Sequence, residues 1–296
     1  MTSSPMRLRS KTRFHARSIS LPSRSHPLIS QFNDYLSRVE FDSEVTSSST
    51  NLSSMSNKLS SLENLYDCVD ALLQLTHTRQ VFAQESHEKW VDQTLEGYLR
   101  LLDACNTTKQ LFSQTKEDLQ EILSVLRRRR EADNICIYSI SRTKAKKMIQ
   151  KSLKEMNCSR NIKRTVVESE KDHETIAIIS MLREVESVTL DLLESFLSYV
   201  AGTNVQSGQS SWCLVSRLMH SRRVSHDEKT LNEFDKVDAA LLSLAGTKCT
   251  NTGRIENVQN ELREMESRIR VLEEGLECLF KRLIRTRVSL LNMLSH

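Results

Sequence analysis

The C-terminal part of the chain carries the pattern that most limits its fold. Apolar side chains recur there with alternating spacings of three and four residues. The repeat consists of Ile255, Val258, Leu262, Met265, Ile269, Leu272, Leu276, Leu279 and Leu283. Sustained spacing of this kind places one apolar stripe along a helix and is typical of coiled coils. The sequence therefore predicts a single long helix over about residues 254–295.

The second half of this predicted helix is apolar on more than one face. Beyond Phe280, further apolar residues lie off the stripe at Ile284, Val288, Leu291 and Leu294. A helix that is apolar on several faces is usually buried among several others. We therefore expect this half to pack inside the chain's own bundle, while residues 255–272 leave an open seam. Burial is expected for Leu262, Ile269, Leu276 and Leu283.

The rest of the chain is also helical in pattern. It has only 6 glycines and 3 prolines in 296 residues, which leaves few turns between long helices. Apolar periodicity predicts further helices over about 52–73, 85–128, 138–156, 162–200 and 229–245, with a short one at 212–220. Gly202 fits a helix C-terminal cap, and a linker is expected near residues 202–211. The predicted fold is all-α, an elongated antiparallel helical bundle over residues 51–296 with long coiled-coil-like helices.

Residues 1–50 differ from this body. They are rich in serine and arginine, and the first acidic residue is Asp34. Such a segment buries too little apolar surface to offset the entropy lost on ordering. We expect a disordered basic tail with at most a short helix around residues 28–39. An organelle transit peptide has a similar composition, so that interpretation stays open.

No pattern of catalytic or metal-binding residues stands out. The 7 cysteines include no C-x-x-C pair, which argues against a zinc site or a disulfide framework and favours a reducing compartment. Phosphate-binding glycine loops, G-x-S-x-G and H-E-x-x-H are absent. The one E-x-x-H, from Glu170 to His173, is a chance match, because di-iron bundles need two copies. We expect a non-enzymatic protein without a metal, cofactor or small-molecule substrate.

Residues 127–164 form the strongest charge feature, with thirteen basic residues against three acidic ones. Its candidate binding residues are Arg127, Arg128, Arg129, Arg130, Lys144, Lys146 and Lys147. The segment could be a solvated face opposite the acidic helix at 168–194, a site for anionic lipid headgroups, a nucleic-acid site or a bipartite nuclear import signal. Nucleic acid is disfavoured because no aromatic stacking platform accompanies the charges. We expect a cytoplasmic location; membrane-peripheral, nuclear and plastid locations stay open.

Three stretches carry a family resemblance. They are FHARSISLPSRSHPL at 14–28, NLYDCVDALLQL at 64–75 and LFKRLIRTRVSLLNMLSH at 279–296. Together they resemble a plant-specific family related to the BYPASS proteins. The resemblance implies a plant source, an all-helical protein, no known enzymatic activity and a link to root and shoot development. The leading hypothesis is a regulatory or scaffold protein that binds protein partners through helical surfaces. The alternative is a peripheral membrane protein that binds anionic lipids through residues 127–164.

The tail also contains a candidate phosphorylation motif. Arg17, Ser18, Ser20 and Pro22 fit R-S-x-S-x-P, a pattern recognised by 14-3-3-type adaptors when its second serine is phosphorylated. Phosphate on Ser20 would add a charge of about −1.5 to −2 and strong acceptor oxygens, which suit an arginine cluster on an adaptor. The competing explanation is that serine and arginine are simply common in disordered tails.

A peptide spanning Phe14 to Leu28 tests the motif. With phosphate on Ser20 it should bind a 14-3-3-type adaptor at micromolar affinity or better, measured by calorimetry, whereas the unphosphorylated peptide should not bind. The hypothesis is wrong if both peptides bind equally well or if neither binds.

Overall fold

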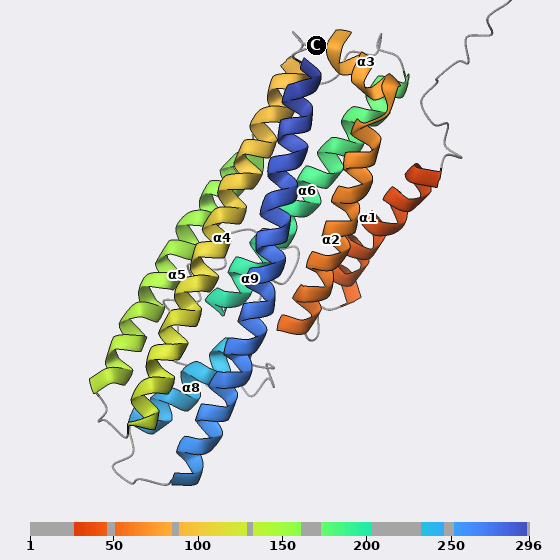
Figure 1. Cartoon of the computed structure of the whole chain (residues 1–296). Helices are drawn as coiled ribbons and strands as arrows, with labels where there is room; N and C mark the ends of the chain where they lie inside the picture. Colours follow the sequence, from red (N-terminus) through yellow and green to blue (C-terminus); the bar gives the residue numbers. More distant parts are fainter. Residues whose placement is uncertain are drawn as a thin grey trace, which may run out of the picture.

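The structure, a computed structural model, describes residues 27–45, 51–84, 89–128, 133–160, 173–202, 232–245 and 252–294. Its helices are α1 (Pro27–Val45), α2 (Leu52–Leu73), α3 (Thr76–Gln84), α4 (Lys89–Arg127), α5 (Asp133–Arg160), α6 (His173–Ala201), α8 (Glu233–Ala245) and α9 (Thr252–Leu294). No strand occurs within these ranges. The predicted all-α, elongated fold is confirmed (Figure 1).

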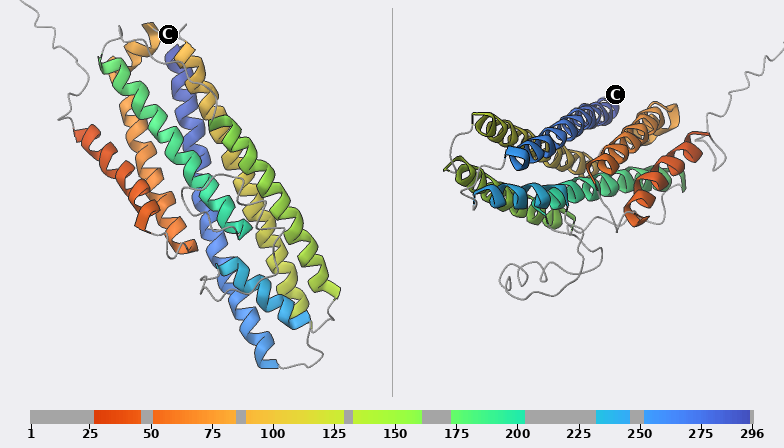
Figure 2. Two further views of the ribbon diagram at one scale, coloured as in Figure 1. Left: turned by 180° about the vertical axis from the view of Figure 1, so that it is seen from behind. Right: turned by 90° about the horizontal axis from the view of Figure 1, so that it is seen from below.

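The helices form two layers. In one layer, α9 lies between α2 and α4; in the other, α6 lies between α1 and α5 (Figure 2). The layers meet where α6 packs on α4 and α2, and α8 contacts α5 and α9 beyond the C-terminal end of α6. One hydrophobic core runs between the layers along the length of the bundle.

Side-chain pairs define the directions of α9 and its two layer neighbours. Along α4, Lys109 pairs with Glu277 and Gln120 bonds Glu266 at 2.7 Å, so the residue numbers run in opposite directions. Along α2, by contrast, Asp67 and Asp70 accept hydrogen bonds from Arg282 and Thr286, so the numbers increase together. The α4–α9 pair is therefore antiparallel, whereas α2 and α9 are parallel.

The apolar stripe of α9 is the centre of the bundle. Its residues from Val258 to Leu283 are buried, and Ile255 is half-buried. The expected burial of Leu262, Ile269, Leu276 and Leu283 is confirmed, since each has an exposed fraction of 0%. The expected open seam at 255–272 is wrong, because α4 and α8 cover this half of α9.

In the second half of α9, several residues are more exposed than the sequence predicted. Ile284, Val288 and Leu291 are 42%, 47% and 37% exposed, whereas we expected them inside the bundle. The reason is the layer arrangement: α9 has neighbours on its two sides and beneath it, but its outer side is uncovered in the part of the chain that the structure describes. These three apolar residues off the stripe therefore lie on the surface, whereas Leu294 is partly buried against the core.

The N-terminal segment is also more structured than expected. The helix predicted at 28–39 is present and extends over Pro27–Val45 as α1. It packs on α2 and buries Phe32 and Val39, so the predicted disordered tail of 50 residues is too long. These two apolar side chains supply the burial that the composition of the segment as a whole did not suggest. The candidate motif from Arg17 to Pro22 lies outside the described residues.

Several helix bounds differ from the predicted ones. The helix expected from residue 85 begins at Lys89, and a separate helix, α3, which was not predicted, ends at Gln84. The helix expected from residue 162 is described only from His173. The linker at 203–211 and the short helix at 212–220 lie outside the described residues.

The end of α6 confirms the predicted glycine cap and explains how α8 attaches. Gly202 has a φ of 75°, the left-handed conformation that glycine adopts readily, and its N–H donates to the carbonyl of Tyr199 at 3.1 Å. The Asn232 side chain donates to the same carbonyl at 2.9 Å and accepts the N–H of Asp235 at 2.7 Å. One asparagine thus joins the C-terminal end of α6 to the N-terminal end of α8.

We predict that Leu276→Ala and Leu283→Ala each lower the free energy of unfolding by about 2–5 kcal/mol, because each leaves a cavity in the core. Leu242→Ala is the matched control, since Leu242 is 62% exposed and its truncation should cost little. Thermal unfolding followed by circular dichroism measures all three. Equal melting temperatures for the core and control variants would contradict this packing.

Candidate functional site

The basic segment of the sequence falls mainly on α5, an outer helix of the bundle (Figures 1 and 2). Arg127 and Arg128 end α4, and Lys144, Lys146 and Lys147 lie on α5. Arg129, Arg130 and residues 161–164 lie outside the described residues. Since α5 packs on α4, α6 and α8, its basic side chains divide between a covered face and a free face.

The covered face is neutralised by α8. Arg142, which is 6% exposed, donates from Nε to the carboxylate of Asp238 at 3.1 and 3.3 Å. Lys146 reaches the same carboxylate at 3.4 Å, and the hydroxyl of Tyr138 donates to it at 2.8 Å. The Arg142 guanidinium also lies over the ring of Phe234, 4.9 Å from its centre. This part of the basic segment therefore holds α8 in place.

Asp238 is the functional neighbour that sequence reasoning missed. An acidic neighbour at 168–194 was one of the interpretations that the sequence left open; α5 does pack on α6, but Arg142 and Lys146 pair with Asp238 of α8. Burial raises the pKa of neighbouring Asp235 above its ordinary value, although Lys146 and Arg142 oppose the shift. Asp238 lies 96 residues from Arg142 in the chain, so no local pattern could have revealed the pair.

The free face of α5 carries a stripe of exposed lysines. We use "lysine stripe" for Lys144, Lys147, Lys151 and Lys154, which follow one another at spacings of three or four. Two large apolar side chains accompany it: Ile140 and Met148 are 56% and 53% exposed. From first to last lysine, the stripe spans about 15 Å. Lys144 and Lys147 of the predicted patch thus belong to the surface, whereas Lys146 belongs to the α8 contact.

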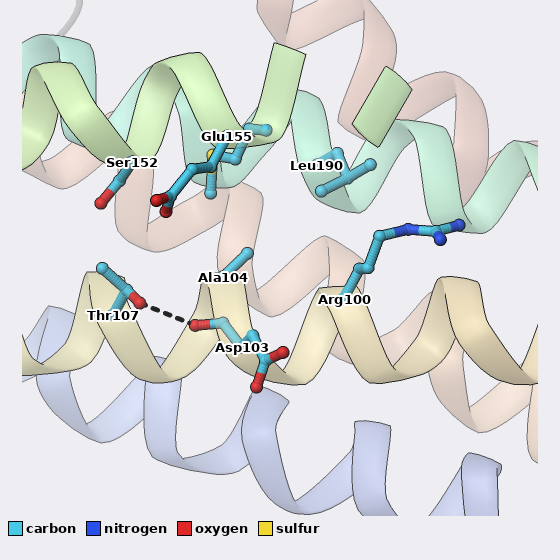
Figure 3. A pocket seen from close by; sticks show the side chains of 8 residues that line it. Arg100, Asp103, Ala104, Thr107, Ser152, Glu155 and Leu190 are labelled. Atoms are coloured by element: carbon cyan, nitrogen blue, oxygen red, sulfur yellow. Dashed lines mark hydrogen bonds between the residues drawn. The ribbon is translucent and has the colours of Figure 1, made fainter. Parts of the chain in front are cut away.

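A small pocket of about 180 Å³ lies between α4, α5 and α6 (Figure 3). Its lining residues are Arg100, Asp103, Ala104, Thr107, Ser152, Glu155, Met156 and Leu190. Two of the charged lining residues already have partners: Arg100 lies 3.8 Å from Glu186, and Glu155 lies 3.7 Å from Lys151. The pocket is below the range of about 300–1,000 Å³ typical of small-molecule sites.

Beside this pocket, the buried carboxylate of Glu186 lies between α4 and α6. Glu186 is 3% exposed, and a Cβ placed on Gly97 would lie 2.6 Å from its carboxylate. Glycine at position 97 therefore makes room for the acid. Nearby, the Tyr66 hydroxyl pairs with that of Thr189 at 3.0 Å, and burial raises the pKa of Tyr66 above its ordinary value. These groups join helices rather than line an open site.

The free cysteines of the described residues differ in burial. Cys68 and Cys105 are buried free thiols, and burial raises the pKa of Cys105 to about 12, so it stays protonated at neutral pH. Cys278 is exposed instead. Within the described ranges, no group of three or more histidine, cysteine, aspartate or glutamate residues is placed to hold a metal ion.

The described helices were also assessed for membrane crossing. None of those in the described part of the chain combines the length and apolar character that a bilayer span requires.

Comparison with known proteins places the chain in a family. Searches of curated proteins and of solved structures each found no match. A family model described as Protein BPS1 matches residues 58–293, which include α4, α5, α6, α8 and most of α9. The match confirms the resemblance to BYPASS-related proteins: the chain belongs to the Protein BPS1 family.

Proposed function

We propose that this protein is a non-enzymatic regulator of root and shoot development in plants, acting as a scaffold that binds protein partners on its helical surfaces. Membership of the Protein BPS1 family supports the developmental role. The observation that carries the scaffold role is the two-sided construction of the long helices. The buried face of α9 fixes the bundle, while its outer face leaves Ile284, Val288 and Leu291 exposed.

This combination suits a scaffold because a rigid bundle holds its backbone in place, so less conformational entropy is lost on binding. Clusters of exposed apolar side chains also mark protein interaction sites. A phosphoserine-binding adaptor on the N-terminal tail, at Ser20, is part of the same proposal.

A dose experiment in plants tests the scaffold role. In a plant lacking this protein, root and shoot growth should be restored at native expression and lost again at strong excess. The loss at strong excess follows from mass action, because surplus scaffold molecules each bind one partner and few hold two partners together. Expression is measured by immunoblot and growth by root and shoot length, with an empty cassette as control. If root and shoot growth rises with expression and stays at its plateau at strong excess, the protein does not act by joining partners on one molecule.

The second candidate function is binding to an anionic membrane surface through α5. The lysine stripe and exposed Ile140 and Met148 favour it, because cationic side chains beside apolar ones suit the headgroup region of a bilayer. Each lysine near an anionic surface contributes about 1 kcal/mol, so four would give useful but salt-sensitive binding. The exposed acid Glu155 beside the stripe reduces this attraction.

Vesicle co-sedimentation tests the membrane candidate. The wild-type chain should bind vesicles containing phosphatidylserine and release them at high salt, and the triple variant Lys144→Glu, Lys147→Glu, Lys151→Glu should not bind. The matched control makes the same charge change on exposed residues of α9: Arg254→Glu, Arg263→Glu, Arg270→Glu. Equal loss in both variants would mean that net charge, and not the stripe, decides binding.

A further inference from the structure

The outer face of the α4–α9 pair carries an apolar patch with no cover in the described part of the chain. We use "outer patch" for Leu99 of α4 with Ile284, Val288 and Leu291 of α9, all at least 37% exposed. Lys109 pairs with Glu277, and this antiparallel register, continued along the helices, puts Leu99 level with Val288. The four side chains therefore lie together on one surface and not on separate faces.

The two borders of the outer patch carry opposite charge. On the α9 side, Lys281 and Arg285 are 68% and 61% exposed; their pairs with Glu277 and Asp70, at 3.5 Å each, are of the exposed, weak kind. On the α4 side, Asp103 is exposed and Glu96 is 58% exposed. The Asp103 side chain points away from α5 (Figure 3). The same register sets Asp103 nearly level with Lys281.

Such a surface is complementary to a copy of itself in one arrangement. A twofold axis parallel to the helices would place α9 of one copy over α4 of the other at the same height. Lys281 would then face Asp103 of the second copy, and Val288 would face Leu99. A twofold axis across the helices would instead place α9 on α9, so the cationic border of one copy would face the cationic border of the other. Closed twofold dimers of this kind are the commonest protein assemblies.

We propose that the outer patch binds a second copy of this chain, in a parallel twofold dimer in which α9 of each copy packs on α4 of the other. This specifies one docking surface for the proposed scaffold. An anionic bilayer is disfavoured as the occupant because Asp103 and Glu96 would face lipid phosphates. An acidic partner helix is also disfavoured, because its carboxylates would face Asp103 and Glu96.

The size of the patch sets the expected affinity. From Lys281 to Leu291 it spans about 15 Å along α9, and two helices side by side are about 20 Å wide. The resulting contact of about 300 Å² per copy is well below the roughly 800 Å² of standard interfaces. We therefore expect a dissociation constant in the micromolar range or weaker, so the dimer must be sought over a wide concentration series.

Sedimentation equilibrium of the full chain tests the dimer. The apparent mass should rise from monomer toward dimer with concentration, and Val288→Glu should raise the dissociation constant about tenfold or more, because it buries a charge at the centre of the contact. Val271→Glu is the matched control, because Val271 is 49% exposed on the same helix but lies outside the outer patch. The dissociation constant of this variant should equal that of the wild-type chain. Circular dichroism should show both variants folded.

A charge swap tests the arrangement. Asp103→Lys should weaken the dimer by placing two cations opposite each other, and the double variant Asp103→Lys, Lys281→Glu should restore it. A monomeric wild-type chain at every concentration would overturn the proposal, as would a dimer unaffected by Val288→Glu. Failure of the double variant to recover would overturn the parallel arrangement. None of these outcomes depends on the dose experiment in plants, so the scaffold proposal can fail or stand separately.

Discussion

Burial of the apolar stripe on α9 is the interaction on which the rest of the structure depends. The stripe is covered from several directions at once, because α2, α3, α4 and α8 all contact this helix. Each fully buried leucine contributes about 1.5–3 kcal/mol relative to an exposed one, and Leu262, Leu272, Leu276, Leu279 and Leu283 all have an exposed fraction of 0%. Removing α9 would leave α2 and α4 without the helix between them in their layer.

Charged groups inside the bundle fix how the remaining helices sit. Hydrophobic contacts alone allow helices to rotate or slide with little change in buried area. Arg142 removes that freedom for α8, since its guanidinium must meet both Asp238 and the ring of Phe234. Glu186 does the same for α6, because its carboxylate fits against Gly97 of α4 and lies 3.8 Å from the Arg100 guanidinium. In both cases, breaking the pair would leave a buried charge without compensation.

These contacts explain which parts of the prediction succeeded. Helix positions followed from local spacing, so the stripe from Val258 to Leu283 and the cap at Gly202 were both found correctly. The sequence did not show which residues of the candidate basic patch pair inside the bundle and which lie on its surface. Lys146 and Lys147 are adjacent in sequence, yet one pairs with Asp238 and the other is exposed. That difference depends on a carboxylate 92 residues away from Lys146, and local spacing holds no information about it.

The sequence by itself determined that most of the described segments are helices and that one side of α9 is buried, because apolar residues spaced three and four apart fall on one side of a helix with 3.6 residues per turn. Only the tertiary structure decided how many further sides are covered. Ile284 and Val288 have the composition of core residues, but α9 lies in a layer and its outer side has no neighbour within the described residues. Phe32 shows the reverse case: a segment with the composition of a disordered tail is ordered because α2 offers it a surface. Whether an apolar side chain is buried thus depends on what packs against it, which is a property of the assembled bundle.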